Sequence, residues 1–265
     1  MSNNEQLTLL AERINSNVNL ADKRILEIGC GNGDLSRFIA GHYSIKHITG
    51  IDPMLSEWWC AGESFGESWS IIDGDVEHLY FDDNCFDTVI SFSTFEHIRN
   101  IDKALSEIKR VLKPYGRFYT EISPIWTSVV GPHFVAPDDL KRNKEQLLHI
   151  TPRGHVYKDE FQMRDHLHRQ TDDDTLISQI LHFIYHIDII NRLSRRSLID
   201  AILNCGMLVR MYNETVVFNR LAIMEVKKTS ELTADILEKV VSAGYDAADI
   251  GVLSMTACLE KYKSL

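Results

Sequence analysis

A glycine-rich stretch that contains one acidic residue carries the clearest chemical signal in the sequence. Residues 25–33 read Ile-Leu-Glu-Ile-Gly-Cys-Gly-Asn-Gly, and a helical pattern begins at Asp34. A strand, a glycine turn and a helix form the first unit of many nucleotide-type sites, because glycine lets the backbone approach a ligand and adopt positive φ without penalty. Glu27, near the carboxyl end of the predicted strand, indicates a ligand that carries a positive group rather than a pyrophosphate.

Further acidic residues follow the later predicted strands. Asp52 stands 19 residues after Gly33, Asp75 follows the third strand, and Glu96 and His97 follow the fourth. Alternation of strands and helices up to residue 122 predicts a parallel sheet, and ligands bind such sheets at the carboxyl ends of the strands. An acid at the tip of the second strand is typical of a ribose contact. Each residue alone is explained equally well as a turn or a helix cap, but the four positions in this order favour a cofactor site.

Hydrophobic spacing predicts the elements that position these residues. The predicted helices span residues 5–16, 34–41, 101–112, 176–190, 196–204 and 232–241. The predicted strands span residues 24–28, 45–51, 70–72, 86–91, 117–122, 207–216 and 251–259. The alternative for the last strand is Leu221–Val226. The predicted fold is α/β: a Rossmann-like, doubly wound, seven-stranded sheet with an antiparallel last strand and a helical and loop insertion after strand five.

Three segments are expected in this fold. Residues 1–123 form the cofactor-binding core, residues 124–195 a substrate-recognition insertion or lid, and residues 196–265 the rest of the sheet with a helical connection between strands six and seven.

Composition limits the class of protein. The 265 residues are 44% hydrophobic and 25% charged with a net charge of −10, which argues against a nucleic acid or an anionic membrane as partner. Five cysteines, an odd number and none in Cys-x-x-Cys spacing, favour a reduced, cytoplasmic protein. Neither a signal peptide nor an apolar run of about 18 residues is visible, so no spanning helix is expected.

Six motifs together resemble one known family, the class I S-adenosylmethionine-dependent methyltransferases. More narrowly, they resemble the type 11-like subgroup related to the ubiquinone and menaquinone methyltransferases. The motifs are residues 26–33, Gly-Ile-Asp at 50–52, Gly-Asp-Val-Glu at 74–77, Phe-Asp-Thr-Val at 86–89, Phe-Glu-His-Ile at 95–98 and Glu-Ile-Lys-Arg-Val-Leu-Lys-Pro-Tyr-Gly at 107–116. The resemblance covers about residues 23–122. It departs at Tyr115, where the family usually has glycine.

The resemblance implies S-adenosyl-L-methionine as cofactor and assigns roles to residues of the motifs. The glycine loop passes beside the methionine part and Glu27 supports that loop, while Asp52 takes the ribose hydroxyls. Asp75 and the backbone N–H of Val76 bind the adenine, and Phe92 lies near the methionine part. The implied cofactor-binding set is Glu27, Gly29, Cys30, Gly31, Gly33, Asp52, Pro53, Asp75, Val76 and Phe92.

A nicotinamide-dependent dehydrogenase is the alternative cofactor enzyme, since it also places an acid after its second strand. It requires Gly-x-Gly-x-x-Gly, and Asp34 stands where the third glycine belongs. It also leaves Glu27 and the Glu96-His97 pair unexplained.

Methyl transfer to an alcohol needs a group that removes the proton of the nucleophile. The base candidates are His133 first, then His149 and His155, which lie in the insertion, while His97 is interpreted as a structural residue of its loop. The pattern from Ser123 to His155 faintly resembles methyltransferases of sugars and polysaccharide precursors.

We therefore expect methyl transfer to a small molecule, with a hydroxyl oxygen of a sugar-type acceptor as the favoured nucleophile. The alternatives are N- or C-methylation of an amine, quinone or aromatic metabolite, and a catalytically silent protein that binds the cofactor. A homodimer through the insertion is a further possibility. His182 and His186 have zinc-like i, i+4 spacing, but packing of their apolar helix is the commoner fate, so no metal is predicted.

Overall fold

The computed structural model describes residues 3–57, 62–128, 131, 154–216, 238–239, 241–245 and 252–262. The chain divides into two compact units. The first unit comprises Met1–Ile122, Ile199–Asn213 and Thr256–Leu265, and the second comprises Ser123–Leu198 and Glu214–Met255. Each unit is described by itself.

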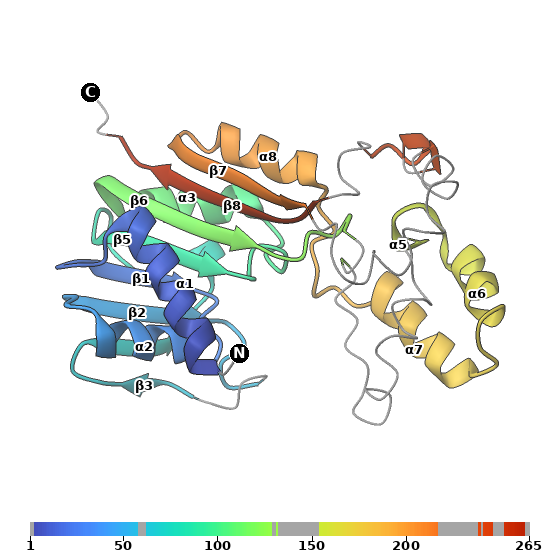
Figure 1. Cartoon of the computed structure of the whole chain (residues 1–265), viewed down its shortest axis with the longest axis horizontal. Coiled ribbons are helices and arrows are strands. Elements are labelled where there is room, and N and C mark those ends of the chain that lie inside the picture. Colours follow the sequence, from blue (N-terminus) through green and yellow to red (C-terminus); the bar gives the residue numbers. More distant parts are fainter. Residues whose placement is uncertain are drawn as a thin grey trace. The chain divides into compact units, whose positions relative to one another are not determined.

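An eight-stranded sheet organises the fold, in the order β3-β4-β2-β1-β5-β6-β8-β7 (Figure 1). Its strands are β1 (Arg24–Ile28), β2 (His47–Asp52), β3 (Ser64–Phe65), β4 (Trp69–Asp73), β5 (Phe86–Phe92), β6 (Leu112–Ile122), β7 (Leu208–Val216) and β8 (Val252–Glu260). The four pairings that join β4, β2, β1, β5 and β6 are all parallel. The order reverses between β1 and β5, the switch point where doubly wound sheets bind ligands. The predicted Rossmann-like fold is confirmed.

The two ends of the sheet refine the prediction. The eighth strand is β3, a two-residue edge strand antiparallel to β4, too short to leave a pattern in the sequence. Residues 252–260 form the last strand, as predicted, whereas the alternative at 221–226 lies outside the described residues. The start of β6 pairs with the end of β8: Tyr115 N–H donates to the Lys261 carbonyl at 2.6 Å and Lys261 N–H to that of Gly116 at 3.0 Å. The last strand is therefore antiparallel to β6, as the arrows in Figure 1 also show.

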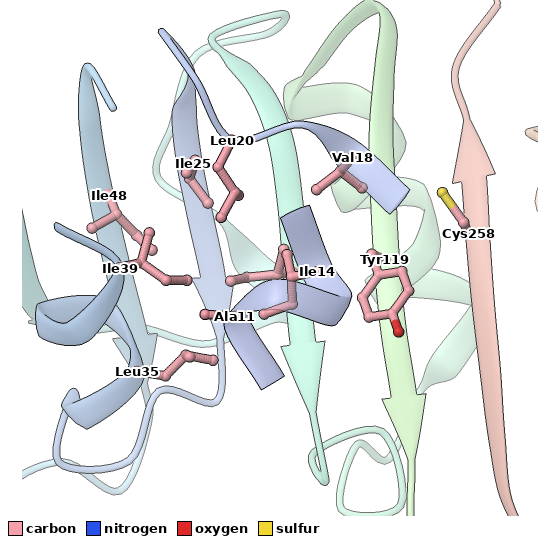
Figure 2. Packing of buried hydrophobic residues seen from close by; sticks show 11 residues of the cluster. Ala11, Ile14, Val18, Leu20, Ile25, Leu35, Ile39, Ile48, Tyr119 and Cys258 are labelled. Carbon is pink, nitrogen blue, oxygen red and sulfur yellow. The ribbon is translucent and has the colours of Figure 1, made fainter. Parts of the chain in front are cut away.

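Two helices cover one face of the sheet in the first unit. These are α1 (Asn3–Val18) and α2 (Asp34–His42), whose buried residues include Ile14 and Ile39. They pack on Ile25, Ile48 and Tyr119 of the sheet (Figure 2). Burial of one such aliphatic side chain contributes about 1.5–3 kcal/mol, so this layer stabilises β1 and α2, the two elements that flank the glycine loop.

The helix after β5 begins where its sequence predicts and ends one residue earlier. α3 spans Ile101–Val111, and the Asn100 side chain caps it by accepting from Lys103 N–H at 2.9 Å. β6 then begins directly at Leu112, five residues earlier than predicted, because Pro114-Tyr115-Gly116 continues the strand instead of forming a separate turn. α8 spans Arg195–Asn204 and ends before Gly206, which has φ 69°.

The second unit contains α5 (Gly154–Tyr157), α6 (Glu160–His168) and α7 (Asp174–Tyr185). Its core is formed by Trp126, Met163, Leu167, Ile177, Ile180, Leu181, Ile184 and Ile190. Asp173 caps α7 by accepting from Thr175 and Leu176 N–H, each at 3.0 Å. α7 ends at Tyr185, five residues before the predicted end. Most of the helix predicted over 232–241 lies outside the described residues.

Candidate functional site

The glycine loop between β1 and α2 has the conformation that its sequence requires. Gly29, Gly31 and Gly33 have φ of 70°, 53° and 82°, a region that only glycine occupies without strain. A Cβ atom on Gly29 would lie 2.1 Å from Thr94 Oγ1, so the loop also passes too close to the end of β5 for any side chain.

Hydrogen bonds fasten this loop to the end of β2. The N–H groups of Gly29 and Cys30 both donate to the Ile51 carbonyl, at 2.8 and 3.0 Å, and Gly31 N–H donates to Asp52 Oδ2 at 3.0 Å. The other oxygen, Oδ1, accepts from Met54 N–H at 2.9 Å. An ionised carboxylate offers about four acceptor positions. The buried Asp52 therefore braces the loop and keeps acceptor capacity for a ligand.

Glu27 is a buried acid beneath the same loop. Its side chain is 4% exposed, and Oε2 accepts a short hydrogen bond from the Ser36 hydroxyl of α2. The pKa of Glu27 is raised to about 7: loss of hydration is the largest cause and the negative charges of Asp52 and Asp34 add to it, while the Ser36 hydrogen bonds lower the pKa. The site thus holds a carboxyl group whose charge a cationic ligand would stabilise.

Cys30 is a structural thiol. Its Sγ is buried and contacts the Gly31 carbonyl at 3.6 Å. Burial raises the pKa of the thiol, first through desolvation and then through the charges of Glu27 and Asp52, so it stays protonated at neutral pH.

The end of β4 supplies the next pair of predicted residues. Asp75 is exposed, and its Oδ1 accepts from Glu77 N–H at 2.8 Å as the cap of the short helix Val76–His78. Asp75 therefore does cap this short helix. Its other carboxylate oxygen, Oδ2, lies 3.9 Å from His78 Nδ1. A small hollow beside these residues is lined by Ile51, Ile72, Gly74 and Asp75 among others.

The segment after β5 closes the site. Phe92 is half-buried, with its ring centroid 5.8 Å from that of Tyr119. Ser93 has φ 45°, and Thr94 Oγ1 donates back to the Phe92 carbonyl at 2.9 Å, which forms a tight turn. Glu96 is buried, whereas His97 is exposed and its backbone N–H donates to the Thr94 carbonyl.

The register of the sheet brings these residues together. Ile28 pairs with Ile51 and with Ser91, and Asp52 pairs with Asp73, so four strands end at one level. The predicted cofactor-binding residues Glu27, Gly29, Cys30, Gly31, Gly33, Asp52, Pro53, Asp75, Val76 and Phe92 all lie at or beside these ends.

The predicted base candidates are placed differently. His133 and His149 lie outside the described residues. His155 is buried in the second unit, where Nε2 lies 2.8 Å from the Trp126 carbonyl and the ring contacts the Trp126 ring edge-on at 4.8 Å. A carbonyl oxygen only accepts, so Nε2 is the donor in this contact.

The apolar helix α7 packs as expected, but the histidine pair lies outside the core that it forms. His182 and His186 are exposed rather than packed in the core, and His186 Nε2 lies 2.9 Å from Glu160 Oε2. Within the described residues, no cluster of three or more potential metal ligands occurs, and none of their helices is long and apolar enough to cross a membrane.

Sequence reasoning missed three residues that shape the loop: Ser36, Arg37 and Thr94. Ser36 and Arg37 sit in the first turn of α2, so their nearness to the glycines was available as a signal. Thr94 lies 65 residues after Gly29, and only the pairing of β1 with β5 brings the two together.

Known proteins match the part of the chain that contains this site. The methyltransferase-domain family matches residues 26–120. A malonyl-[acyl-carrier protein] O-methyltransferase of Geobacter sulfurreducens is 32% identical over 133 residues, which is 49% of this chain and 46% of the relative. A fatty-acid O-methyltransferase of Mycolicibacterium smegmatis is 32% identical over 105 residues, 38% of either chain. The chain thus spans less than half the length of these curated relatives.

Solved structures are similar in fold. Phosphoethanolamine N-methyltransferase 2 of Haemonchus contortus, in complex with S-adenosyl-L-methionine, superposes with a TM-score of 0.54 at 16% identity, over 98% of this chain and 53% of that one. At this identity the likeness concerns the fold alone.

Proposed function

We propose that this chain, whose residues 26–120 form a methyltransferase domain of the class I S-adenosylmethionine-dependent family, transfers a methyl group from that cofactor to a small-molecule acceptor. The observation that carries the proposal is the hydrogen bond from Gly31 N–H to Asp52, which fixes a three-glycine loop against the acid that ends β2.

The chemistry of the residues fits S-adenosylmethionine. The cofactor carries a sulfonium and an ammonium group, and the buried residue near the end of β1, before the glycine loop, is Glu27, a carboxyl group with acidic neighbours. Asp52 keeps acceptor positions for two ribose hydroxyls, and Asp75 offers an acceptor at the end of β4. A pyrophosphate would meet these acids with repulsion, which counts against a dinucleotide.

The bound cofactor supplies an activated methyl group on a positively charged sulfur. The task left to the chain is alignment and exclusion of water. Orientation of reactants contributes up to about 7–11 kcal/mol in favourable intramolecular reactions. In this proposal the glycine loop fixes the methionine part, the acids fix the nucleoside part, and the predicted insertion over 124–195 covers the acceptor.

An oxygen is the proposed nucleophile, and a hydroxyl of a sugar-type acceptor remains the favoured form. Two curated relatives are named as O-methyltransferases, of malonyl-[acyl-carrier protein] and of fatty acids, which supports oxygen and adds carboxyl groups to the acceptors worth testing. Relatives named as sterol C-methyltransferase and glycine N-methyltransferase keep carbon and nitrogen as alternatives. A base role for His133, His149 or His155 stays a prediction.

Cofactor binding tests the proposal first. Calorimetry with S-adenosylmethionine and with its demethylated product is expected to give binding to the unmodified protein. Asp52→Ala is expected to weaken it at least tenfold, because the variant loses both the ribose contact and the loop anchor, about 1.5–3 kcal/mol for a charged hydrogen bond. The exposed Asp82→Ala variant is the matched control and is expected to bind normally.

Activity is tested with methyl-labelled cofactor and a panel of hydroxylated, carboxylated, amine and quinone acceptors. A labelled product from a hydroxyl or carboxyl acceptor supports oxygen methylation. Tight cofactor binding without product from any acceptor would favour the catalytically silent alternative, and no cofactor binding would refute the proposal.

A further inference from the structure

Arg37 of α2 joins three parts of the first unit through one guanidinium group. Its Nη1 donates to the Asn32 carbonyl in the glycine loop at 2.6 Å, and its Nη2 donates to Ser64 Oγ of β3 at 3.1 Å. The guanidinium carbon lies 4.9 Å from the centroid of the Trp69 ring, at the start of β4. A single side chain thus reaches the loop and both strands at the edge of the sheet.

The glycine loop needs such a contact. Three glycines with positive φ allow the backbone many conformations, so the loop is ordered only by bonds to its surroundings. The N–H groups of Gly29, Cys30 and Gly31 are held by β2 and Asp52, and Gly33 N–H donates to the Cys30 carbonyl at 2.8 Å. Arg37 holds the peptide that joins Asn32 to Gly33, because it fixes the direction of the carbonyl.

The edge strands β3 and β4 connect the Arg37 contact with the part of the site that contains Asp75. β3 pairs with β4 through Ser64 and Ile71, and β4 leads directly to Asp75. Ile71 also packs against the loop, since a Cβ on Gly33 would lie 2.6 Å from its Cδ1. Arg37 therefore bridges the loop at one side and the strand that leads to Asp75 at the other.

We propose that Arg37 is a positioning residue of the cofactor site, which sets the Asn32–Gly33 peptide and locks the glycine loop to the β3–β4 edge without touching the cofactor. The inference rests on the proposed function, since it assigns this loop and this edge to the two ends of one cofactor.

Lysine cannot replace this arrangement. The guanidinium is planar, donates in two directions at once and stacks on the Trp69 ring, whereas an ammonium group is a point charge without a flat face. The ion pair with Asp34 is a minor part of it, because the two side chains are 3.9 Å apart and 38% and 48% exposed.

The test compares Arg37→Met and Arg37→Lys with a surface control. Arg169→Met serves as control because the Arg169 side chain, directly after α6, is 74% exposed and pairs with the exposed Asp165 four residues earlier. Ser64→Ala removes one partner of Arg37 while the guanidinium stays in place. Each variant is measured by calorimetry with S-adenosylmethionine, by steady-state kinetics on the acceptor identified for the unmodified protein, and by urea denaturation.

Arg37→Met is expected to weaken cofactor affinity about tenfold, the effect of losing one charge-assisted hydrogen bond. The KM for cofactor rises by the same factor, while kcat at saturating cofactor and the KM for the acceptor stay within about twofold, because the reacting atoms are untouched. Arg37→Lys recovers less than half of the lost binding free energy, Ser64→Ala loses about threefold in affinity, and Arg169→Met binds normally.

Unchanged cofactor affinity in folded Arg37→Met would overturn the inference, and so would a loss of stability without a rise in the KM for cofactor. If Arg37→Met does not fold, the same criteria apply to Arg37→Lys and Ser64→Ala. A failure of the unmodified protein to bind the cofactor would instead refute the proposed function, so the two failures are distinguishable.

Discussion

Replacement of the buried acid under the glycine loop, Glu27→Gln, should change how stability depends on pH. Burial raises the pKa of Glu27 to about 7, whereas an unfolded glutamate ionises near 4.5. Between these values the folded chain binds one proton more than the unfolded chain, so the free energy of unfolding falls as pH rises. Above pH 7 both states are ionised and the contribution becomes constant.

The size of this effect follows from the two pKa values. One pKa unit corresponds to about 1.4 kcal/mol, so the complete change amounts to about 3 kcal/mol, of which about 2–3 kcal/mol falls between pH 5 and pH 8. Glutamine has nearly the same shape and stays neutral, and its amide can still pair with the Ser36 hydroxyl. The difference in unfolding free energy, variant minus unmodified protein, should therefore rise by about 2–3 kcal/mol from pH 5 to pH 8.

Urea denaturation of both proteins at half-unit steps of pH measures this difference directly, because all other titrating groups are common to both and cancel. Glu12→Gln, at an exposed position of α1, is the control for the loss of one glutamate at the surface. Parallel curves for Glu27→Gln and the unmodified protein would refute the reasoning, since they would mean that Glu27 ionises normally in the folded state.

Two backbone predictions follow from the same structure. Gly29→Ala should lower the free energy of unfolding by about 3 kcal/mol or more, because of the positive φ and the clash with Thr94. The control Gly41→Ala, in open space within α2, should raise it by about 0.5–1 kcal/mol. Equal changes of the two variants in urea denaturation would contradict this prediction. Tyr115→Gly should gain about 0.5–1 kcal/mol, because Tyr115 has φ 65° and a side chain 65% exposed. Tyr80→Gly, at an 88% exposed position without positive φ, should lower the stability. If thermal denaturation gave stability changes of the same sign for both variants, the explanation by the positive φ of Tyr115 would be wrong.

Tyr115 is the position at which the sequence departs from the family pattern, and the structure gives a physical reason to notice it. The family usually has glycine there, and the structure gives the residue a left-handed conformation. Its backbone N–H donates to the carbonyl of Lys261, directly after β8, so the conformation serves the pairing of two strands that lie far apart in the sequence. The sequence marks the position as unusual, and only the sheet explains what the residue is doing there.

Local patterns alone determined much of this protein. Ile25 to Gly33 specified a strand, a left-handed glycine loop and a helix, because backbone sterics and apolar periodicity act over a few residues. The parallel strands and the acids at their ends followed from the same periodicity, and the structure has them in the predicted order.

Tertiary structure decided the features that depend on residues distant in sequence. The two-residue strand β3 exists only because β4 offers an edge to pair with, and Thr94 reaches Gly29 only because β1 pairs with β5. The raised pKa of Glu27 is likewise a consequence of burial, which no residue type reveals. Steric effects between neighbouring residues can be predicted from the sequence. Strand pairing, desolvation and the contacts of a long side chain such as Arg37 depend on residues that only the packed chain brings together.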